Sequence, residues 1–311
     1  MAFNLQTFKT RALTALLFVV VMLVGLLWNF WSFLILFTVI HFGCWFEYLK
    51  LVEKVYDTKI DIVIKWFFAI CGFTLVLVFG LRHESHEFFF TPSVANFSIK
   101  INIKWAFWIL LIICLLVFLF QNKQIPVKAK RMSFAGLIYI SLSIAFLLNL
   151  RDSGLMSYDG IFFFDIGVFY SLIIIFSIWI NDTMAYLVGS FIGKTPLTKI
   201  SPKKTWEGTV GGALLAIIVI GFSAKFILSS FLEHHFPGVL ISPNYSMCFI
   251  IPALCAIFGT LGDLLESKLK RMADVKDSGS FMPGHGGFLD RFDSLLVAVP
   301  AVWVFVYFFI K

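Results

Sequence analysis

The chain has 311 residues, of which 60% are hydrophobic and only 14% are charged, and its mean hydropathy is +0.93. Soluble domains carry roughly 25% charged residues, so this composition excludes a soluble globular protein and predicts a chain that is solvated by lipid. The formal net charge of +7 is compatible with nucleic acid, with anionic lipid headgroups or with membrane topology. The positions of the charges distinguish these cases.

Apolar runs along the chain predict the helices that cross the membrane. A bilayer needs about 20 apolar residues per helix, and runs of this size predict nine spans, at residues 12–28, 30–46, 62–80, 105–120, 134–150, 163–180, 208–228, 248–265 and 292–310. The first run has no small-residue cleavage site and is predicted to be a retained span. Only the corner at Trp28 and Asn29 separates the first two runs, which predicts a helical hairpin or, alternatively, one long bent helix.

The basic residues of the loops predict the orientation. Lys and Arg gather in cytoplasmic loops, and most of the 25 Lys and Arg fall on one side when the N-terminus is placed in the cytoplasm. We therefore expect an all-α integral membrane protein with about nine transmembrane helices, an N-terminus in the cytoplasm and a C-terminus on the opposite side. The net charge is then mostly topological, and nucleic acid is not an expected partner.

Polar residues divide the chain into two regions. Residues 1–180 are expected to form about six spans. Residues 181–311 are expected to carry the chemistry, with cytoplasmic loops at 181–207 and 266–291.

One helical stripe of polar residues lies at the end of the run 248–265. Its members are spaced i, i+3, i+4 and i+7, so they share one face of a helix: Asp263, Glu266, Ser267 and Lys270. A carboxylate exposed to hydrocarbon would cost several kcal/mol, so Asp263 needs a cation. The stripe is expected to face a wet cavity.

Asp290 and Asp293 stand on the first turn of the last span. Together with Asp263 they would suit Mg²⁺, which is commonly held by one or two carboxylates while substrate phosphates and water complete its shell. Alternatively, the two acids are helix-start residues favoured by the helix dipole, and Asp263 is paired with Lys or Arg. Spacing alone does not separate these interpretations.

Glycines between these acids favour an anion site. Gly286 and Gly287 leave the backbone bare, so that its N–H groups can point at an anion. Nearby side chains add cations and one imidazole: Lys270, Arg271, Lys276, His285 and Arg291. Phosphate fits this combination best.

A second cluster precedes the run 208–228. Ser201 and Pro202 resemble the cap and the first residue of a helix, so Lys203, Lys204 and free backbone N–H groups would gather at one helix end. Alternatively, the two lysines only mark topology. Gly208 and Gly212 form a GxxxG pair, which predicts close helix packing.

Asn181, Asp182 and Thr183 end the apolar run 163–180. Asp182 is a further candidate cation ligand at the same predicted face. The alternative, a helix end that faces water, fits the sequence equally well.

The C-terminal pattern resembles a known family. Ser267, Leu269, Lys270 and Arg271 are followed by Lys276, Asp277 and Gly279, and then by Pro283, His285, Gly286, Gly287, Asp290, Arg291 and Asp293. This pattern is similar to the signature of phosphatidate cytidylyltransferases (CDP-diacylglycerol synthases). Met282 departs from the usual Leu, Ile or Phe, and residues 1–180 match only as hydrophobic spans.

The resemblance implies transfer of CMP from CTP to phosphatidate, which gives CDP-diacylglycerol and pyrophosphate. The distribution of Lys and Arg predicts that the site lies on the cytoplasmic face, and from the length and the short N-terminus we expect a multi-pass protein of a bacterial cytoplasmic membrane. The resemblance also implies Mg²⁺ on Asp263 and Asp290, with K⁺ as a further candidate, and we add Asp182 and Asp293 as second ligands. The expected partners are CTP, phosphatidate and membrane lipid, with a second copy of the chain as a candidate. The phosphates would be held by residues that we expect to bind substrate or to act in the reaction: Ser201, Lys203, Lys204, Thr205, Ser267, Lys270, Arg271, Lys276, His285, Gly286, Gly287 and Arg291.

Two alternatives stay open at this point. A CTP-dependent polyprenol or phytol kinase would release CDP instead of pyrophosphate. A transporter would carry acids near the middle of the membrane and show internal repeats, and no repeat is apparent in the sequence.

Overall fold

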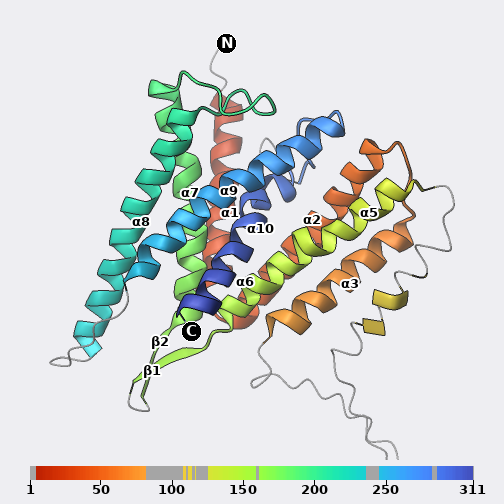
Figure 1. Cartoon of the computed structure of the whole chain (residues 1–311). Coiled ribbons are helices and arrows are strands. Elements are labelled where there is room, and N and C mark those ends of the chain that lie inside the picture. Colours follow the sequence, from red (N-terminus) through yellow and green to blue (C-terminus); the bar gives the residue numbers. More distant parts are fainter. Residues whose placement is uncertain are drawn as a thin grey trace, which may run out of the picture. The chain divides into compact units, whose positions relative to one another are not determined.

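A computed structural model describes residues 5–81, 125–158, 161–235, 245–281 and 286–310, with short pieces at 108–109, 111–113 and 116. Helices make up most of this part of the chain (Figure 1). The chain separates into two compact units: Met1–Asp152 with Met272–Arg291, and Ser153–Arg271 with Phe292–Lys311.

The first unit contains α1 (Leu5–Leu27), α2 (Phe30–Val55), α3 (Ile62–Gly80), α5 (Val127–Gly136), the π-helix η1 (Leu137–Leu142) and α6 (Ser143–Arg151). The helices α1 and α2 are separate, which confirms the hairpin. Asn29 caps α2, because its side chain accepts a hydrogen bond from Ser32 N at 2.8 Å while Ser32 Oγ accepts one from Asn29 N at 3.0 Å. This capping box satisfies two donors at the helix start.

The core of the first unit holds a polar group among aromatic side chains. Ser141, in the π-helical turn η1, lies 3.0 Å from His41 Nε2 and accepts a hydrogen bond from Trp45 Nε1 at 2.9 Å. A Cβ on Gly72 would overlap Ser141 Oγ, so α3 approaches this group as closely as a backbone can. The bonds lower the cost of burying these polar atoms.

The second unit begins with the antiparallel strands β1 (Leu155–Tyr158) and β2 (Ile161–Asp165). It continues with α7 (Ile166–Ile192), α8 (Trp206–His235), α9 (Ser246–Met272), α10 (Leu289–Phe305) and the π-helix η2 (Val306–Ile310), although the first three residues of α10 belong to the first unit. The short hairpin was not predicted from the sequence.

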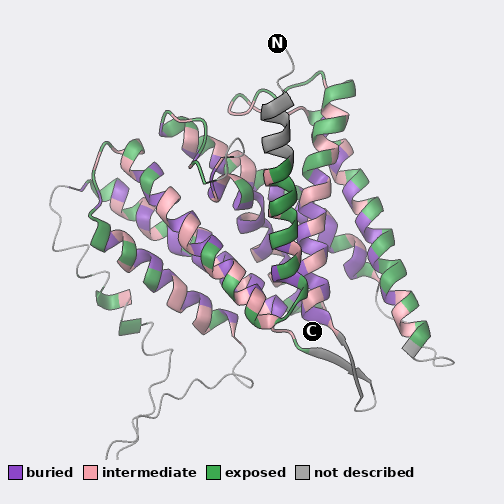
Figure 2. Ribbon diagram, turned by 180° about the vertical axis from the view of Figure 1, so that it is seen from behind, coloured by how far each residue is buried: buried purple, intermediate pink, exposed green. Residues whose placement is uncertain are grey.

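Close packing of α7 on α8 confirms the prediction from GxxxG. A Cβ on Gly208 would lie 2.7 Å from Ala185 O, and one on Gly212 would lie 2.7 Å from Ala185 Cβ. Small residues at these positions let the two backbones touch. The outer side of α8 exposes large apolar side chains such as Phe222 and Phe226, whereas Ala216 and Ala224 are buried, and Figure 2 shows these two kinds of residue on different sides of the helices.

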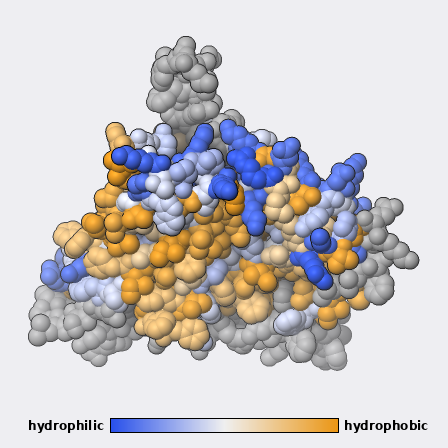
Figure 3. All heavy atoms as spheres, turned by 45° about the horizontal axis from the view of Figure 1, so that its top comes forward, coloured by the Kyte–Doolittle hydropathy of each residue, from blue (hydrophilic) through white to orange (hydrophobic). Residues whose placement is uncertain are grey.

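Within the described part of the chain, seven helical segments are long and apolar enough to cross a membrane: α2, α3, the continuous segment Val127–Arg151, α7, α8, α9 and Leu289–Ile310. Hydrophobic side chains also cover much of the visible surface in Figure 3. The predicted class, an all-α integral membrane protein, is confirmed. Of the nine predicted spans, the first corresponds to the shorter apolar stretch Leu13–Leu27, and the one at 105–120 lies largely outside the described residues.

The expected regional boundary at residue 180 lies inside α7, and the two compact units interleave along the chain. The division by chemical role therefore stays a prediction, as does the orientation of the termini.

Candidate active site

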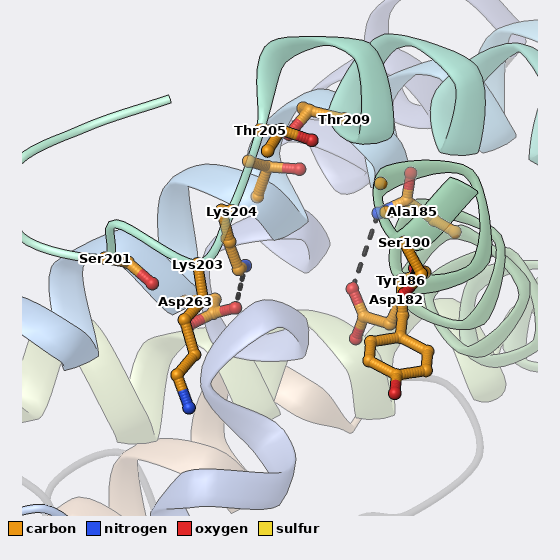
Figure 4. Close-up of a pocket in the computed structure, with 13 residues that line it drawn as sticks. Asp182, Ala185, Tyr186, Ser190, Ser201, Lys203, Lys204, Thr205, Thr209 and Asp263 are labelled. Carbon is orange, nitrogen blue, oxygen red and sulfur yellow. Dashed lines mark hydrogen bonds and ion pairs between the residues drawn. The ribbon is translucent and has the colours of Figure 1, made fainter. Parts of the chain in front are cut away.

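A polar pocket of about 510 Å³ lies in the second unit (Figure 4). Its walls come from α7, from the loop that precedes α8, and from α8 and α9. The lining residues are Asn181, Asp182, Ala185, Tyr186, Gly189, Ser190, Ser201, Lys203, Lys204, Thr205, Thr209, Thr260 and Asp263. Several residues predicted independently at the three clusters, Asp182, Ser201, Lys203, Lys204, Thr205 and Asp263, thus share one cavity.

The positive charge that Asp263 was expected to need is supplied by a lysine of the same chain. Lys204 Nζ forms an ion pair with Asp263 Oδ2, and Ser267 Oγ donates a hydrogen bond to Asp263 Oδ1 at 3.2 Å. One turn further along α9, Lys270 pairs with the fully buried Glu266 at 2.5 Å. The members of the predicted stripe do pair along one face of α9, but of the four only Asp263 lines the pocket, and Glu266 is fully buried instead of facing a wet cavity. The ion-pair alternative for Asp263 is the one present in the structure.

The ammonium group of Lys204 is only partly exposed, with 29% of its side-chain surface accessible. Burial lowers the pKa of Lys204, while the carboxylates of Asp182 and Asp293 oppose this shift and the charge of Lys270 adds to it. A partly buried ammonium group binds an anionic ligand more strongly than an exposed one does, because water screens their attraction less.

The loop before α8 differs from the prediction. The expected helix start at Ser201 and Pro202 is wrong, since α8 begins at Trp206. Leu197 N donates to Lys204 O at 2.7 Å and Trp206 N donates to Thr195 O at 2.9 Å, so pairing within the loop occupies the backbone that a longer helix would need. Thr205 caps the helix instead, because its Oγ1 accepts a hydrogen bond from Gly208 N at 3.1 Å.

The helix α7 continues past the predicted end of its span, up to Ile192. Asn181 and Asp182 therefore sit inside a helix that lines the pocket, and Asn181 Nδ2 donates to Asp182 Oδ1 at 3.4 Å. Asn181 is 2% exposed, and its Oδ1 has no hydrogen-bond partner within the described part of the chain. Such a buried acceptor in a pocket is expected to be satisfied by a ligand or by water.

A second group of predicted residues lies in the first unit, around the start of α10. The carboxylate oxygen Oδ2 of Asp290 accepts hydrogen bonds from Ser278 N at 2.9 Å and from Gly287 N at 2.7 Å, and Ser278 Oγ also lies 2.9 Å from it. These donors fix the orientation of the carboxylate. A ligating carboxylate is usually held by such hydrogen bonds.

The sequence analysis missed Glu47 of α2. Its carboxylate accepts hydrogen bonds from Phe288 N at 3.0 Å, from Leu289 N at 2.9 Å and from Ser278 Oγ at 2.8 Å. The available signal was an acidic residue inside a long apolar helix, which is a functional candidate by default, although Glu53 on the same helix carries the same signal.

The bare backbone at Gly286 and Gly287 was expected to face a phosphate. Gly286 does take the left-handed conformation, with φ of 84°, and a Cβ there would lie 2.6 Å from Asp290 Oδ2. However, the N–H of Gly287 donates to Asp290, so this donor serves a protein carboxylate in the structure.

The other predicted residues are more dispersed. Arg271, Lys276 and Arg291 are exposed, and none of them lines the pocket. Asp293 is buried and accepts a hydrogen bond from Ser294 N at 2.6 Å. His285 lies outside the described residues.

The acids fit a divalent cation in part. Among the residues that the structure describes, no group of three or more His, Cys, Asp or Glu side chains could hold a metal ion. Asp182 and Asp263 do line one pocket from different helices, and Mg²⁺ bound with its phosphates needs only one or two protein carboxylates. The donor set therefore fits Mg²⁺ that arrives with a phosphorylated ligand.

Fold and pocket define the class: a multi-pass membrane protein with a charged pocket among its helices. A family model described as "Cytidylyltransferase family" matches residues 9–309, so the chain belongs to the cytidylyltransferase family.

Relatives with known names agree with this assignment. The chain is 37% identical to a phosphatidate cytidylyltransferase of Bacillus subtilis over 172 residues, which is 55% of this chain and 54% of the relative. It is 30% identical to the Aquifex aeolicus protein of the same name, over 74% of this chain and 79% of the relative. It is 42% identical to the chloroplastic phosphatidate cytidylyltransferase 4 of Arabidopsis thaliana, over 45% and 33%. The chain thus spans about half the length of the first of these relatives.

Proposed function

We propose that this protein transfers the cytidylyl group of CTP to phosphatidate, giving CDP-diacylglycerol and pyrophosphate. Membership of the family and the names of the relatives support the reaction. The structural observation that supports this reaction is one pocket lined by Lys203, Lys204, Asp182 and Asp263, in which Lys204 pairs with Asp263. Such a site suits a polyanion that arrives together with a cation.

The chemistry fits the residues present. A phosphate oxygen of phosphatidate is already ionised at neutral pH, so no side chain has to remove a proton from the nucleophile. The protein must instead reduce repulsion between two anions and stabilise the leaving pyrophosphate, which is a task of positioning and electrostatics. Lys203 and Lys204 would hold phosphate groups, and the hydroxyls of Ser201 and Thr205 would donate hydrogen bonds to them.

We propose Mg²⁺ as the cofactor, with Asp263 and Asp182 as ligands in the pocket and Asp290 and Asp293 as the further acids predicted from the sequence. Bound there, Mg²⁺ would neutralise phosphate charge and orient the triphosphate. Lys204 would then exchange its ion pair with Asp263 for contacts with phosphate. The family resemblance adds K⁺ as a second candidate ion.

The remaining roles are proposals of the same kind. Lys270, Arg271, Lys276, Arg291 and His285 would contribute to binding the phosphates, and Ser267 would orient Asp263. The enzyme would reside in the cytoplasmic membrane with its site on the cytoplasmic face, where CTP is present. The homodimer stays a prediction, which mass measurement of the detergent-solubilised protein tests.

The test gives purified protein α-labelled CTP, phosphatidate and Mg²⁺. We expect the label in a lipid product and the release of pyrophosphate. Release of labelled CDP would identify a CTP-dependent kinase of polyprenol or phytol instead. If neither product forms with phosphatidate or with polyprenol, the proposal is wrong and transport becomes the better explanation.

A further inference from the structure

Glu47 is a carboxylate that α2 carries inside a predicted membrane span, Phe30–Val55. A carboxylate there is costly unless it is paired. Glu47 is satisfied by donors that lie far along the chain: it accepts the N–H groups of Phe288 and Leu289, 241 and 242 residues away, and the hydroxyl of Ser278. All of these residues belong to the first unit.

These bonds give α10 a cap from another helix. The first N–H groups of a helix have no partner within it, and a negative charge near them is favoured by the helix dipole. Helices usually receive such a cap from the residue just before them. Here the acceptor at 3.0 and 2.9 Å is Glu47, so α2 holds the backbone at the start of α10.

Two glycines make room for this carboxylate. A Cβ on Gly279 would overlap Glu47 Oε1, and a Cβ on Gly287 would overlap Glu47 Oε2. Both glycines belong to the pattern that identified the family resemblance. Their lack of a side chain is thus explained by the space that Glu47 fills.

Ser278 connects Glu47 to Asp290. Its Oγ lies 2.8 Å from Glu47 Oε2 and 2.9 Å from Asp290 Oδ2, while its N–H also donates to Asp290. Gly287 N, next to the N–H groups that Glu47 holds, donates to Asp290 at 2.7 Å. Displacement of Glu47 would therefore move two of the donors that orient Asp290.

We propose that Glu47 is a positioning residue for the reaction: it holds Ser278 and residues 287–289 in the conformation that orients Asp290. This inference rests on the proposed function for its catalytic consequence. The structural role of Glu47, which is to hold the backbone beside Asp290, does not depend on which reaction the protein catalyses.

The experiment compares Glu47→Gln with Glu53→Gln in the full-length protein. Glu53 is a matched control, because it lies on the same helix and accepts hydrogen bonds from Ile60 N and Lys65 Nζ, both at 2.7 Å, away from the loop. Glutamine has the shape of glutamate but only one acceptor oxygen, so one N–H group at the start of α10 loses its partner. A small misplacement of a reacting group can cost about a hundredfold in rate.

We expect Glu47→Gln to lower kcat by at least about tenfold, with the KM for CTP changed much less, and Glu53→Gln to leave kcat nearly unchanged. Hydrogen exchange supplies a readout without activity: the amides of Phe288 and Leu289 should exchange faster in Glu47→Gln and at the wild-type rate in Glu53→Gln. If both variants keep the wild-type kcat and amide protection, the inference is wrong. If the wild-type protein forms no lipid product, the proposed function fails, and hydrogen exchange still decides whether Glu47 holds the loop.

A double-mutant cycle separates this contact from general damage. Gly279→Ala should displace the Glu47 carboxylate and lower kcat on its own. In a Glu47→Ala background the same substitution has nothing to displace, so its effect should largely vanish, as expected for residues in contact. Effects of Gly279→Ala that are equal in the two backgrounds would contradict the proposal.

Discussion

Removing the ammonium group of Lys204 tests the pocket most directly. Lys204→Met keeps a long side chain but removes the ion pair with Asp263, which then retains the hydrogen bond from Ser267 at 3.2 Å. Hydrogen bonds to charged groups contribute about 1.5 to 3 kcal/mol, and each 1.4 kcal/mol corresponds to about a factor of ten. Because the two side chains are only 29% and 26% exposed, solvent screening is limited. We expect kcat/KM for CTP to fall by about 10- to 100-fold.

The assay measures initial rates of labelled lipid formation over a range of CTP concentrations. Lys199→Met is the control, since Lys199 lies in the same loop, is exposed and does not line the pocket. Size-exclusion profiles and Tm values of both variants check that they fold.

A comparable kcat/KM in Lys204→Met and Lys199→Met would refute the assignment. The basic residues of this loop would then act only as topology signals. If kcat/KM and Tm both fall in the two variants, the loss of activity reflects a general loss of stability, which likewise refutes a specific role of Lys204 in the pocket.

Three further predictions concern the acids, the pH dependence and the helix packing. Asp290→Asn should lower turnover at saturating Mg²⁺ by at least about tenfold, and near wild-type turnover would exclude Asp290 as a ligand. Burial lowers the pKa of Lys204, so its charge is lost at a lower pH than that of an exposed lysine, and kcat/KM should fall on the alkaline side. Lys204→Arg, which stays charged, should shift that fall to higher pH, and an unshifted profile would contradict this. Gly212→Val should destabilise the protein by about 1 to 3 kcal/mol through overlap with Ala185, seen as a lower Tm, and an unchanged Tm would show that α7 and α8 do not pack there.

Much of the fold follows from the apolar runs, because a bilayer imposes their length. The break between the first two helices and the close approach at Gly212 were also predicted, since the corner at Trp28 and Asn29 and the spacing of small residues are local signals. The start of α8 was predicted wrongly because Ser201 was taken as its cap, whereas Thr205 caps the helix. Pairing between Leu197 and Lys204 decided between them, and such pairing between residues of a loop is not visible in a helix pattern.

Part of the predicted set of site residues lines one pocket, but the pairing of these residues was not predictable. The sequence placed Asp263, Lys204 and Asp182 near one face, and the structure brings them to one pocket. It could not show that Lys204 pairs with Asp263, because 59 residues separate them. Glu47 was missed for the same reason: its partners are defined only once the helices are assembled.

The remote cap on α10 has a consequence for how the protein is made. Glu47 is synthesised about 240 residues before the N–H groups that it holds, so Phe288 and Leu289 can gain their hydrogen-bond acceptor only after α2 is already in place. A fragment that lacks α2 would contain every residue of the C-terminal pattern and still begin its last helix without this cap. The pattern is therefore expected to identify relatives reliably, but to work only in chains that also supply the carboxylate from α2.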